Sequence, residues 1–327
     1  MASSVITAEI SGRGTRAREF ARKLRGGDAI AHTIAWTFAT SIVVMTVLLV
    51  MELFQQSALS RGKFGWSFFF TRVWDPVAGE FGALPFIYGT LVTSGLCLAM
   101  AVPLGLGAAI FLSEMAPPRI SDALTFVIEL LAAVPSVIYG LLGVFVLVPI
   151  MRDVVEPALT DTLGFLPLFA GPGYGVGVLT ANVVLAVMIL PFIVSISREA
   201  LLAVPRDQQE ASLAVGATRW ETTAKVVVPY ARLGIIGSLF LGLARALGET
   251  MAVTMVIGND PKINASLLAP GYSIAAVIAN EFTEATADLH LSALVELGLV
   301  LFLMTILING AARVLILATT RKGSAHP

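Results

Sequence analysis

The stretch GIIGSLFLGLARALGET, residues 234–250, decides the fold class of this chain. Small residues recur in it at every fourth position, namely Gly234, Ser238, Gly242 and Ala246. This spacing lines one face of an apolar helix with small side chains, which lets a second helix approach closely inside a membrane. The stretch therefore predicts a membrane-spanning helix that packs against protein along this face.

Arg245 and Glu249 fall on the same face, at about 100° per residue. A charge near the middle of a spanning helix costs about 2.5 to 3.5 kcal/mol on insertion scales, so it is seldom found there without a partner or a task. Glu249 can neutralise Arg245 four residues away, although this order opposes the helix dipole. Apolar residues often replace buried ion pairs without loss. We therefore favour a role in a substrate path or its gate over a purely structural pair.

Arginine suits oxyanions because its planar fork offers several donors and stays cationic at any working pH. A nearby carboxylate can prevent overly tight capture of the anion and reset the site after release. Glu129, in the third expected span, is a second candidate partner for Arg245. The alternative for Glu129 is a solvated position near the cytoplasmic end of that span.

The composition is that of a polytopic membrane protein. Of the 327 residues, 57% are hydrophobic and 13% charged, and the mean hydropathy is +0.86. Soluble domains have an apolar share of about 45 to 50%. The net charge of −1 points to no charged partner, so we expect contact with lipid and none with nucleic acid. The single cysteine, Cys97, excludes a disulfide within the chain.

We expect an all-α fold of about six spanning helices, since each span needs roughly 20 apolar residues. The expected spans are 34–54, 86–113, 123–150, 177–197, 233–257 and 292–317. They form a transmembrane permease domain, 34–317, between a basic tail, 1–33, and a short tail, 318–327. The first span is too long for a signal-peptide core, and Glu9 and Glu19 fit a mitochondrial transit peptide poorly.

The cations of the connections gather on one side of the membrane. Only a few lie on the other side, namely Arg61, Lys63, Arg72, Arg152 and Lys262. The positive-inside rule then places both termini in the cytoplasm.

Two outer connections, 55–85 and 258–291, are long enough to build an external surface. The second contains a Pro-Gly pair followed by 273–285, which is typical of a short amphipathic helix outside the membrane. Such surfaces either dock a soluble partner or only plug the mouth of the bundle.

The longest inner connection, 198–232, predicts two short helices. Pro205 suits the start of the first, and Gly216 suits its end. Thr218 with Glu221 forms a capping box that opens the second, which we expect to close near Pro229. Two helices joined by a glycine bend make a rigid knob that can transmit force to a soluble domain.

The segment EASLAVGATRWETTAKVVVP, residues 210–229, resembles the EAA loop of ABC importer permeases. The matching positions are Glu210, Ala211, Ser212, Gly216 and Pro229, with serine in place of the third alanine. The spacing from the glutamate to the glycine and the proline fits fully. The resemblance implies a type I ABC importer permease whose loop inserts into a groove of a separate ATP-binding subunit.

Two further segments, IELLAAVPSVIYG at 128–140 and RALGETMAVTMVIGN at 245–259, resemble the PstC family of phosphate permeases. Sulfate and molybdate permeases share the R-x-L-G-E core, so that core alone leaves the oxyanion open. The continuation TMAVT, residues 250–254, favours phosphate. The resemblance implies location in the bacterial inner membrane. The partners that it implies are a PstA-like sister permease, a PstB-like ATPase dimer and a PstS-like phosphate-binding protein.

The sequence contains no G-x-x-x-x-G-K-[ST] loop, so a partner must bind and hydrolyse ATP. No Cys/His spacing suggests a metal site, and no G-x-S-x-G motif suggests a hydrolase. We expect a transport subunit that is not itself an enzyme and carries no cofactor.

Two other classes remain open. A proton-coupled transporter can use Glu129, Arg245 and Glu249 as a relay, but it needs no ATPase-docking loop and often shows an internal repeat. A phosphate-sensing membrane protein predicts ligand-dependent partner binding without flux.

Overall fold

The structure is a computed structural model that describes residues 28–323, with side chains described for 30–314. The chain divides into two units, Met1–Gln55 and Gln56–Pro327. Residues 1–27 of the expected basic tail, 1–33, lie outside the described residues. The last four residues of the expected C-terminal tail, 318–327, also lie outside them.

The first unit contains one described helix, α2 (Asp28–Gln56). Its apolar stretch Ile30–Gln56 is 27 residues long, which at 1.5 Å per residue is enough to cross a bilayer. The helix is apolar all round, as expected for a span that contacts lipid. It begins six residues before the expected span, 34–54, and ends two residues after it.

The second unit is also helical, and the part of it that the structure describes has no named strand. Its elements are α3 (Ala58–Phe64), η1 (Gly65–Phe69), α4 (Leu84–Ile110), η2 (Phe111–Met115), α5 (Pro118–Ala132), α6 (Ser136–Leu142), η3 (Gly143–Leu147), α7 (Val148–Ile150), η4 (Met151–Val155), α8 (Glu156–Leu163), η5 (Pro167–Phe169), α9 (Val178–Leu202), α10 (Arg206–Ala214), α11 (Arg219–Thr222), η6 (Thr223–Val227), α12 (Val228–Leu247), α13 (Met251–Val256), α14 (Ile274–Glu281) and α15 (Asp288–Gly323).

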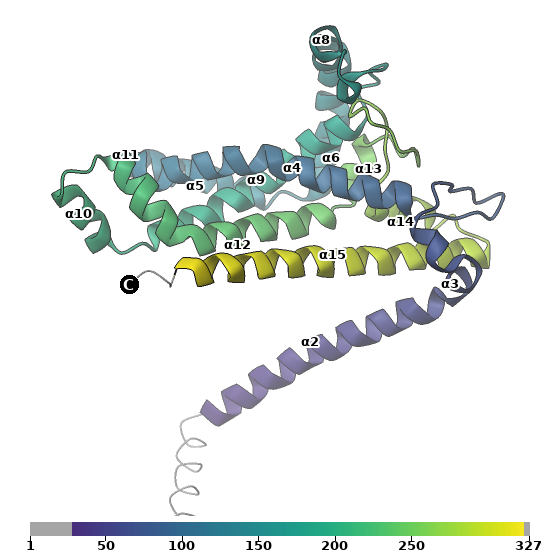
Figure 1. Ribbon diagram of the computed structural model, residues 1–327, viewed down its shortest axis with the longest axis horizontal. Coiled ribbons are helices and arrows are strands. Elements are labelled where there is room, and N and C mark those ends of the chain that lie inside the picture. The colour runs from purple at the N-terminus through teal and green to yellow at the C-terminus, as the bar shows by residue number, and fades with distance from the viewer. Residues whose placement is uncertain (1–27, 324–327) are drawn as a thin grey trace, which may run out of the picture. The chain divides into compact units, whose positions relative to one another are not determined.

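Six stretches of the described residues are long and apolar enough to cross a membrane, which confirms the expected all-α class and number of spans. They are Ile30–Gln56, Leu84–Met115, Ser136–Leu163, Val178–Leu202, Arg219–Leu247 and Asp288–Val314. Figure 1 shows α4, α9, α12 and α15 running along the same bundle.

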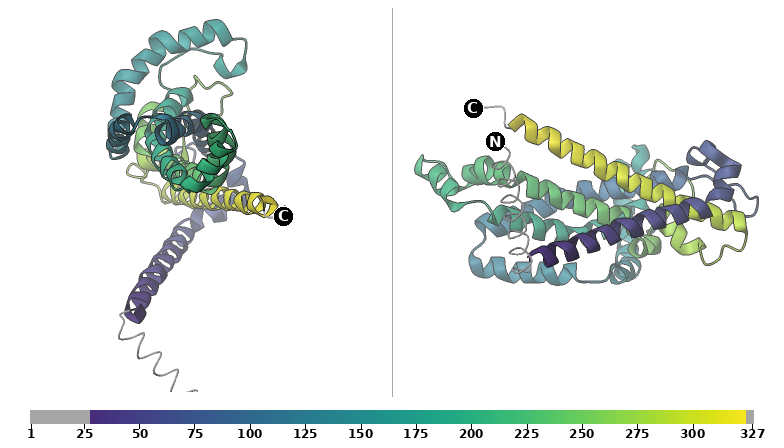
Figure 2. Two further views of the ribbon diagram at one scale, coloured as in Figure 1. Left: turned by 90° about the vertical axis from the view of Figure 1, so that its left-hand side faces the viewer. Right: turned by 90° about the horizontal axis from the view of Figure 1, so that it is seen from below.

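Helix α9 lies at the centre of this bundle and packs against α4, α12 and α5. Its inward side chains are aliphatic and include Leu185, Ile189 and Ile193, all fully buried. Looking along the bundle, Figure 2 shows the segment from α6 to α8 arching away from it. The core that positions the site is therefore the contact of α9 with its three neighbours.

The stripe of small residues on α12 faces α9, as the sequence predicts. A Cβ added to Gly234 would lie 2.4 Å from Cβ of Ala200, and one added to Gly242 would lie 3.3 Å from Ile193. The contact residues have rising numbers along α12 and falling numbers along α9, so the two helices pack antiparallel. Small side chains set this close approach, because a larger residue would force the backbones apart.

The expected third span, 123–150, is wrong. Helix α5 ends at Ala132, and the span begins at Ser136 and runs to Leu163. Pro135 has the extended conformation of a residue outside a helix. Proline disfavours the helical conformation of the residue before it, which explains why the helix stops short of Val134.

The expected fifth span, 233–257, is interrupted. Helix α12 ends at Leu247, and α13 starts at Met251 after a break at Gly248. Glycine is a poor helix former, which favours an end at this position. Arg245 therefore lies in the last turn of α12 and not in the middle of a continuous helix.

The second short helix of the inner connection does not close near Pro229, contrary to expectation. Helix α11, the π turn η6 and α12 form one continuous stretch, Arg219–Leu247, and Pro229 lies in the first turn of α12. Local π turns are one of the adjustments by which spanning helices accommodate proline. The knob is thus continuous with the span that carries Arg245.

The outer connection 258–291 contains α14, which begins one residue later than expected. The hydroxyl of Ser273 caps it by accepting a hydrogen bond from the N–H of Ala276 at 3.3 Å. Its first turn is buried against α15 and α13, with Ile274 and Val277 fully buried. Helix α14 is thus packed on the bundle, and its two expected roles, docking a soluble partner or plugging the bundle mouth, stay predictions.

Candidate functional site

The guanidinium of Arg245 lies over an aromatic ring. Its Cζ atom is 4.2 Å from the centre of the Phe192 ring on α9. This distance is typical of a cation–π contact, in which the negative face of the ring attracts the cation. The Nε atom of Arg245 is buried and has no hydrogen-bond partner within the described chain.

Glu249 lies in the break between α12 and α13. Its Oε1 atom accepts a hydrogen bond from the backbone N–H of Ala252 at 3.2 Å, which serves the first turn of α13. Among the described residues, no carboxylate oxygen lies within 4.0 Å of Arg245. The neutralisation of Arg245 by Glu249 that the spacing predicts is therefore absent here, because the helix ends before the glutamate.

Glu129 is exposed in the last turn of α5. Over the described ranges it forms no ion pair, so the structure does not bring it together with Arg245. Its part in a substrate path stays a prediction.

Tyr139, on α6, connects the two helix breaks. Its hydroxyl donates a hydrogen bond of 2.8 Å to the carbonyl of Leu131, across the break between α5 and α6. The tyrosine side chain is buried, at 6% exposed. The next residue, Gly140, lets α6 pack on α13, since a Cβ there would be 3.1 Å from Cα of Ala252. The two broken helices are thus packed together close to Arg245.

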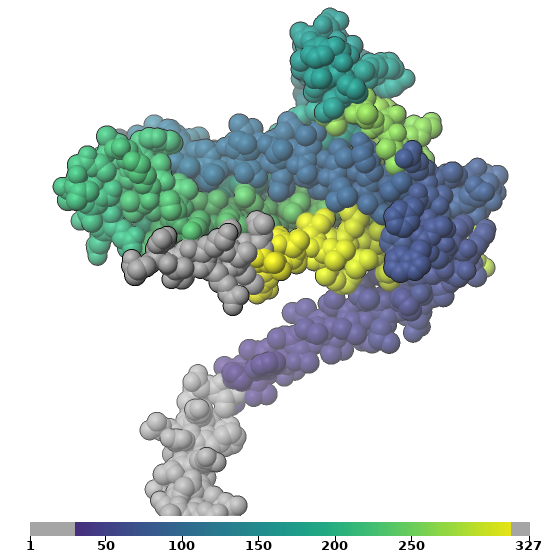
Figure 3. Space-filling view, in the orientation of Figure 1, coloured from purple at the N-terminus to yellow at the C-terminus, as the bar shows by residue number. Residues whose placement is uncertain are grey.

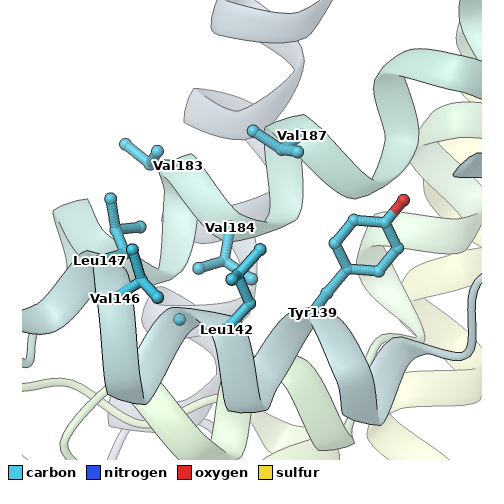
Figure 4. Close-up of a pocket in the computed structure, with 8 residues that line it drawn as sticks. Tyr139, Leu142, Val146, Leu147, Val183, Val184 and Val187 are labelled. Atoms are coloured by element: carbon cyan, nitrogen blue, oxygen red, sulfur yellow. The ribbon is translucent and has the colours of Figure 1, made fainter.

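A hollow of about 180 Å³ opens beside Tyr139, between α6–η3 and α9 (Figure 4). It is lined by Tyr139, Leu142, Gly143, Val146, Leu147, Val183, Val184 and Val187. In the figure the tyrosine hydroxyl points away from the aliphatic side chains. An oxyanion would find no hydrogen-bond donor among these side chains, so this hollow does not suit an anion.

The capping box and the glycine bend of the inner knob, α10 to α11, are built as the sequence predicts. Thr218 and Glu221 form a reciprocal capping box, and Gly216 has a φ of +91°, which favours glycine. The hydroxyls of Ser212 and Thr222 lie 3.1 Å apart and tie the two helices together. Figure 3 shows this segment, in green, at one end of the body.

The surface of the knob is open. Glu210 and Ala211 are exposed, and so are two large apolar side chains, Val215 at 86% and Trp220 at 59%. Exposed apolar groups of this size at the tip of a rigid element are typical of a protein interface. Beside the knob, a polar hollow of about 220 Å³ separates α10 and η6 from Glu114 on η2.

The sequence pattern does not identify Phe192 or Tyr139 as residues of the site. Phe192 follows a proline in an apolar span and has no charged neighbour that would distinguish it from a lipid-facing phenylalanine. Tyr139 lies inside the segment 128–140, but its link to Leu131 depends on a break that the pattern does not predict.

The fold has counterparts among solved ABC importers. One is the inward-facing MetNI methionine ABC transporter, with a TM-score of 0.51 and 18% identity, covering 75% of this chain and 99% of that chain. Another is a bacterial ABC transporter involved in the import of the acidic polysaccharide alginate, with a TM-score of 0.54 and 17% identity over 85% and 95% of the two chains. At these identities, the likeness concerns the fold alone.

The family model described as binding-protein-dependent transport system inner membrane component matches residues 101–320 of this chain. The chain belongs to this family, and it is therefore a multi-pass inner-membrane component of a transport system and not an enzyme.

Within that class, three similar relatives are each named phosphate transport system permease protein PstC. The protein from Mesorhizobium japonicum is 47% identical over 95% of each chain. That from Xylella fastidiosa is 50% identical over 79% of this chain and 81% of its own. That from Haemophilus influenzae is 45% identical over 85% and 90%.

Proposed function

We propose that the chain is the permease subunit through which an ATP-driven importer moves inorganic phosphate into the cytoplasm. The observation that carries the proposal is the state of Arg245, a cation at a helix break with no carboxylate partner among the described residues and an unsatisfied, buried Nε. A tetrahedral oxyanion supplies the negative charge and the acceptor that such a group lacks. The names of the relatives support phosphate as that anion.

Arg245 and Glu249 line the path or its gate in this proposal. Broken helices near the middle of the membrane are where transporters of other folds hold their substrates, because backbone ends and side chains there escape the lipid. The breaks after Ala132 and Leu247 meet through the packing of α6 on α13. A movement of either helix would change the surroundings of Arg245.

The knob couples this site to the separate subunit that binds and hydrolyses ATP. The continuous stretch Arg219–Leu247 joins α11 to the last turn of α12, so a displacement of the knob is transmitted along one rigid element to Arg245. The exposed Val215 and Trp220 offer an apolar contact for a soluble partner. We assign Glu210, Ala211, Ser212, Gly216 and Pro229 to this coupling loop.

The partners in this proposal are a PstA-like sister permease, a PstB-like ATPase dimer and a PstS-like phosphate-binding protein. The large apolar side chains exposed on α6 to α8, such as Phe145 and Val154, leave this face open to the sister permease as well as to lipid. Both termini lie in the cytoplasm, as the distribution of cations indicates.

The test is ATP hydrolysis by the reconstituted complex of this chain with its sister permease, ATPase and binding protein. Phosphate, sulfate and molybdate are titrated separately. We expect stimulation by phosphate alone. Stimulation by another oxyanion would keep the importer and change its cargo, whereas a complex that no oxyanion stimulates would contradict the proposal and favour a proton-coupled or sensory protein.

A further inference from the structure

Among the described residues, no carboxylate neutralises the positive charge of Arg245. The carboxylate four residues away, Glu249, is turned toward the N–H of Ala252. The hydroxyl of Tyr139 donates its hydrogen bond to the carbonyl of Leu131. A cation in a half-buried position loses hydration, and a group that compensates this loss must come from elsewhere.

The ring of Phe192 supplies that compensation. It lies 4.2 Å from Cζ of Arg245, well inside the range of about 6 Å over which a ring face attracts a cation. A carboxylate in the same place would cancel the charge, and an arriving anion would then have to displace it. A phenyl ring stabilises the cation through its quadrupole and leaves the full positive charge in place.

The position of the ring is fixed by the packing of α9 on α12. Phe192 lies between Pro191 and Ile193, both buried, and Ile193 packs against Gly242, one turn before Arg245. Further along the interface, the hydroxyls of Ser197 and Ser238 lie 2.7 Å apart. The register of the two helices therefore holds the guanidinium of Arg245 over the ring of Phe192.

We infer that Phe192 is a positioning residue for transport: its ring holds the Arg245 guanidinium as an unneutralised cation that remains available to the oxyanion. This inference rests on the proposed function and adds the residue that keeps the cation available. In this inference Phe192 acts on the anion only through the charge of Arg245, whose Cζ atom lies 4.2 Å from the centre of the ring.

Fluorination of the ring tests this role without a change of shape. Phe192 is replaced in turn by mono-, di- and trifluorinated phenylalanine, each of which weakens the negative face of the ring while occupying nearly the same volume. The matched control is the same series at Phe240, a half-buried phenylalanine of α12 that is not over Arg245. The readout is uptake of phosphate into vesicles that contain the complete complex.

We expect maximal uptake to fall stepwise with fluorination at Phe192, by about tenfold at the trifluorinated ring, which corresponds to most of a desolvated cation–π contact. The phosphate concentration at half-maximal uptake should stay constant, since the binding protein sets it in the proposed function. Phe192→Leu should lose uptake to a similar extent, and Phe192→Trp should retain it.

A flat series at Phe192, or an equal decline at Phe240, would overturn the inference, because only a cation–π contact depends on the electrons of the ring at one position. An error in the proposed substrate, phosphate, would be detected separately from an error in the role of Phe192. If the unaltered complex carries sulfate and not phosphate, the same series measured with sulfate still decides the role of Phe192.

Discussion

The hydroxyl oxygens of Ser197 on α9 and Ser238 on α12 lie 2.7 Å apart, and both side chains are fully buried. Ser238 also donates to the carbonyl of Ile235, so the hydrogen between the helices comes from Ser197. This contact lies in the interface that fixes Phe192 against Arg245. The stability of the interface and the geometry of the site are therefore linked.

We expect Ser238→Ala to lower the unfolding free energy by about 0.6 kcal/mol, the average for a hydrogen bond between spanning helices. Ser238→Leu should lower it by about 1 to 3 kcal/mol, because the added atoms overfill a packed interface. Unfolding of the detergent-solubilised protein measures both. A leucine variant as stable as the alanine variant would show that the two helices are not in tight contact.

Gly234 offers a sharper test of the same contact. A Cβ at this position would lie 2.4 Å from Cβ of Ala200, so Gly234→Ala should destabilise the chain by about 1 to 3 kcal/mol. Gly237→Ala is the matched control, since nothing lies within 4 Å of its added Cβ. We expect the second change Ala200→Gly to restore the stability of Gly234→Ala, and a failure of this rescue would contradict the assigned packing.

The bend of the knob depends on Gly216, whose φ of +91° is unfavourable for any residue with a side chain. We expect Gly216→Val to reduce substrate-stimulated ATP hydrolysis by about tenfold or more, because the two helices of the knob would lose their relative orientation. Thr218→Ser, which keeps the capping hydroxyl, should hydrolyse ATP at the normal rate. Unaltered stimulation of the Gly216→Val complex would argue against coupling through the knob.

Glu156 holds the loop that precedes α9. Its carboxylate is 99% buried and accepts a hydrogen bond of 2.8 Å from the N–H of Gly175, whose carbonyl in turn accepts one from Thr180. Glu156→Ala leaves this buried N–H unpaired and should cost about 1 to 3 kcal/mol.

Glu156→Gln keeps an acceptor at the same place and should retain most of this stability. Protease cleavage at residues 171–175, followed over time in detergent, distinguishes the two variants. Equal cleavage of the alanine and glutamine variants would mean that the hydrogen bond does not hold the loop.

The fold class and the knob follow from local patterns. The four-residue spacing from Gly234 to Ala246 predicts the face of α12 that contacts α9, because small residues act through their own position in the helix. The pair Thr218 and Glu221 likewise predicts its capping box, since both partners lie within one turn. Features of this kind need no knowledge of the rest of the chain.

The site could be predicted only in part. Pro135 ends a helix, whereas Pro103 and Pro191 lie inside α4 and α9, and local sequence does not separate these cases because the neighbouring helices decide them. The contact of Phe192 with Arg245 joins two spans, so no spacing along the chain indicates it. Gly248 favours a break, but Gly234, Gly237 and Gly242 lie inside the same helix, so a glycine alone does not tell where α12 ends and Glu249 is separated from Arg245.

A phosphate ion that crosses the membrane in this proposal passes a site formed by Arg245, and uptake of radiolabelled phosphate by vesicles with the complete complex measures that passage. Arg245→Gln, which removes the charge and keeps much of the side chain, should abolish uptake while the complex still assembles. Arg245→Lys should restore only part of it, because an ammonium lacks the planar fork. Normal uptake by an assembled Arg245→Gln complex would contradict the account.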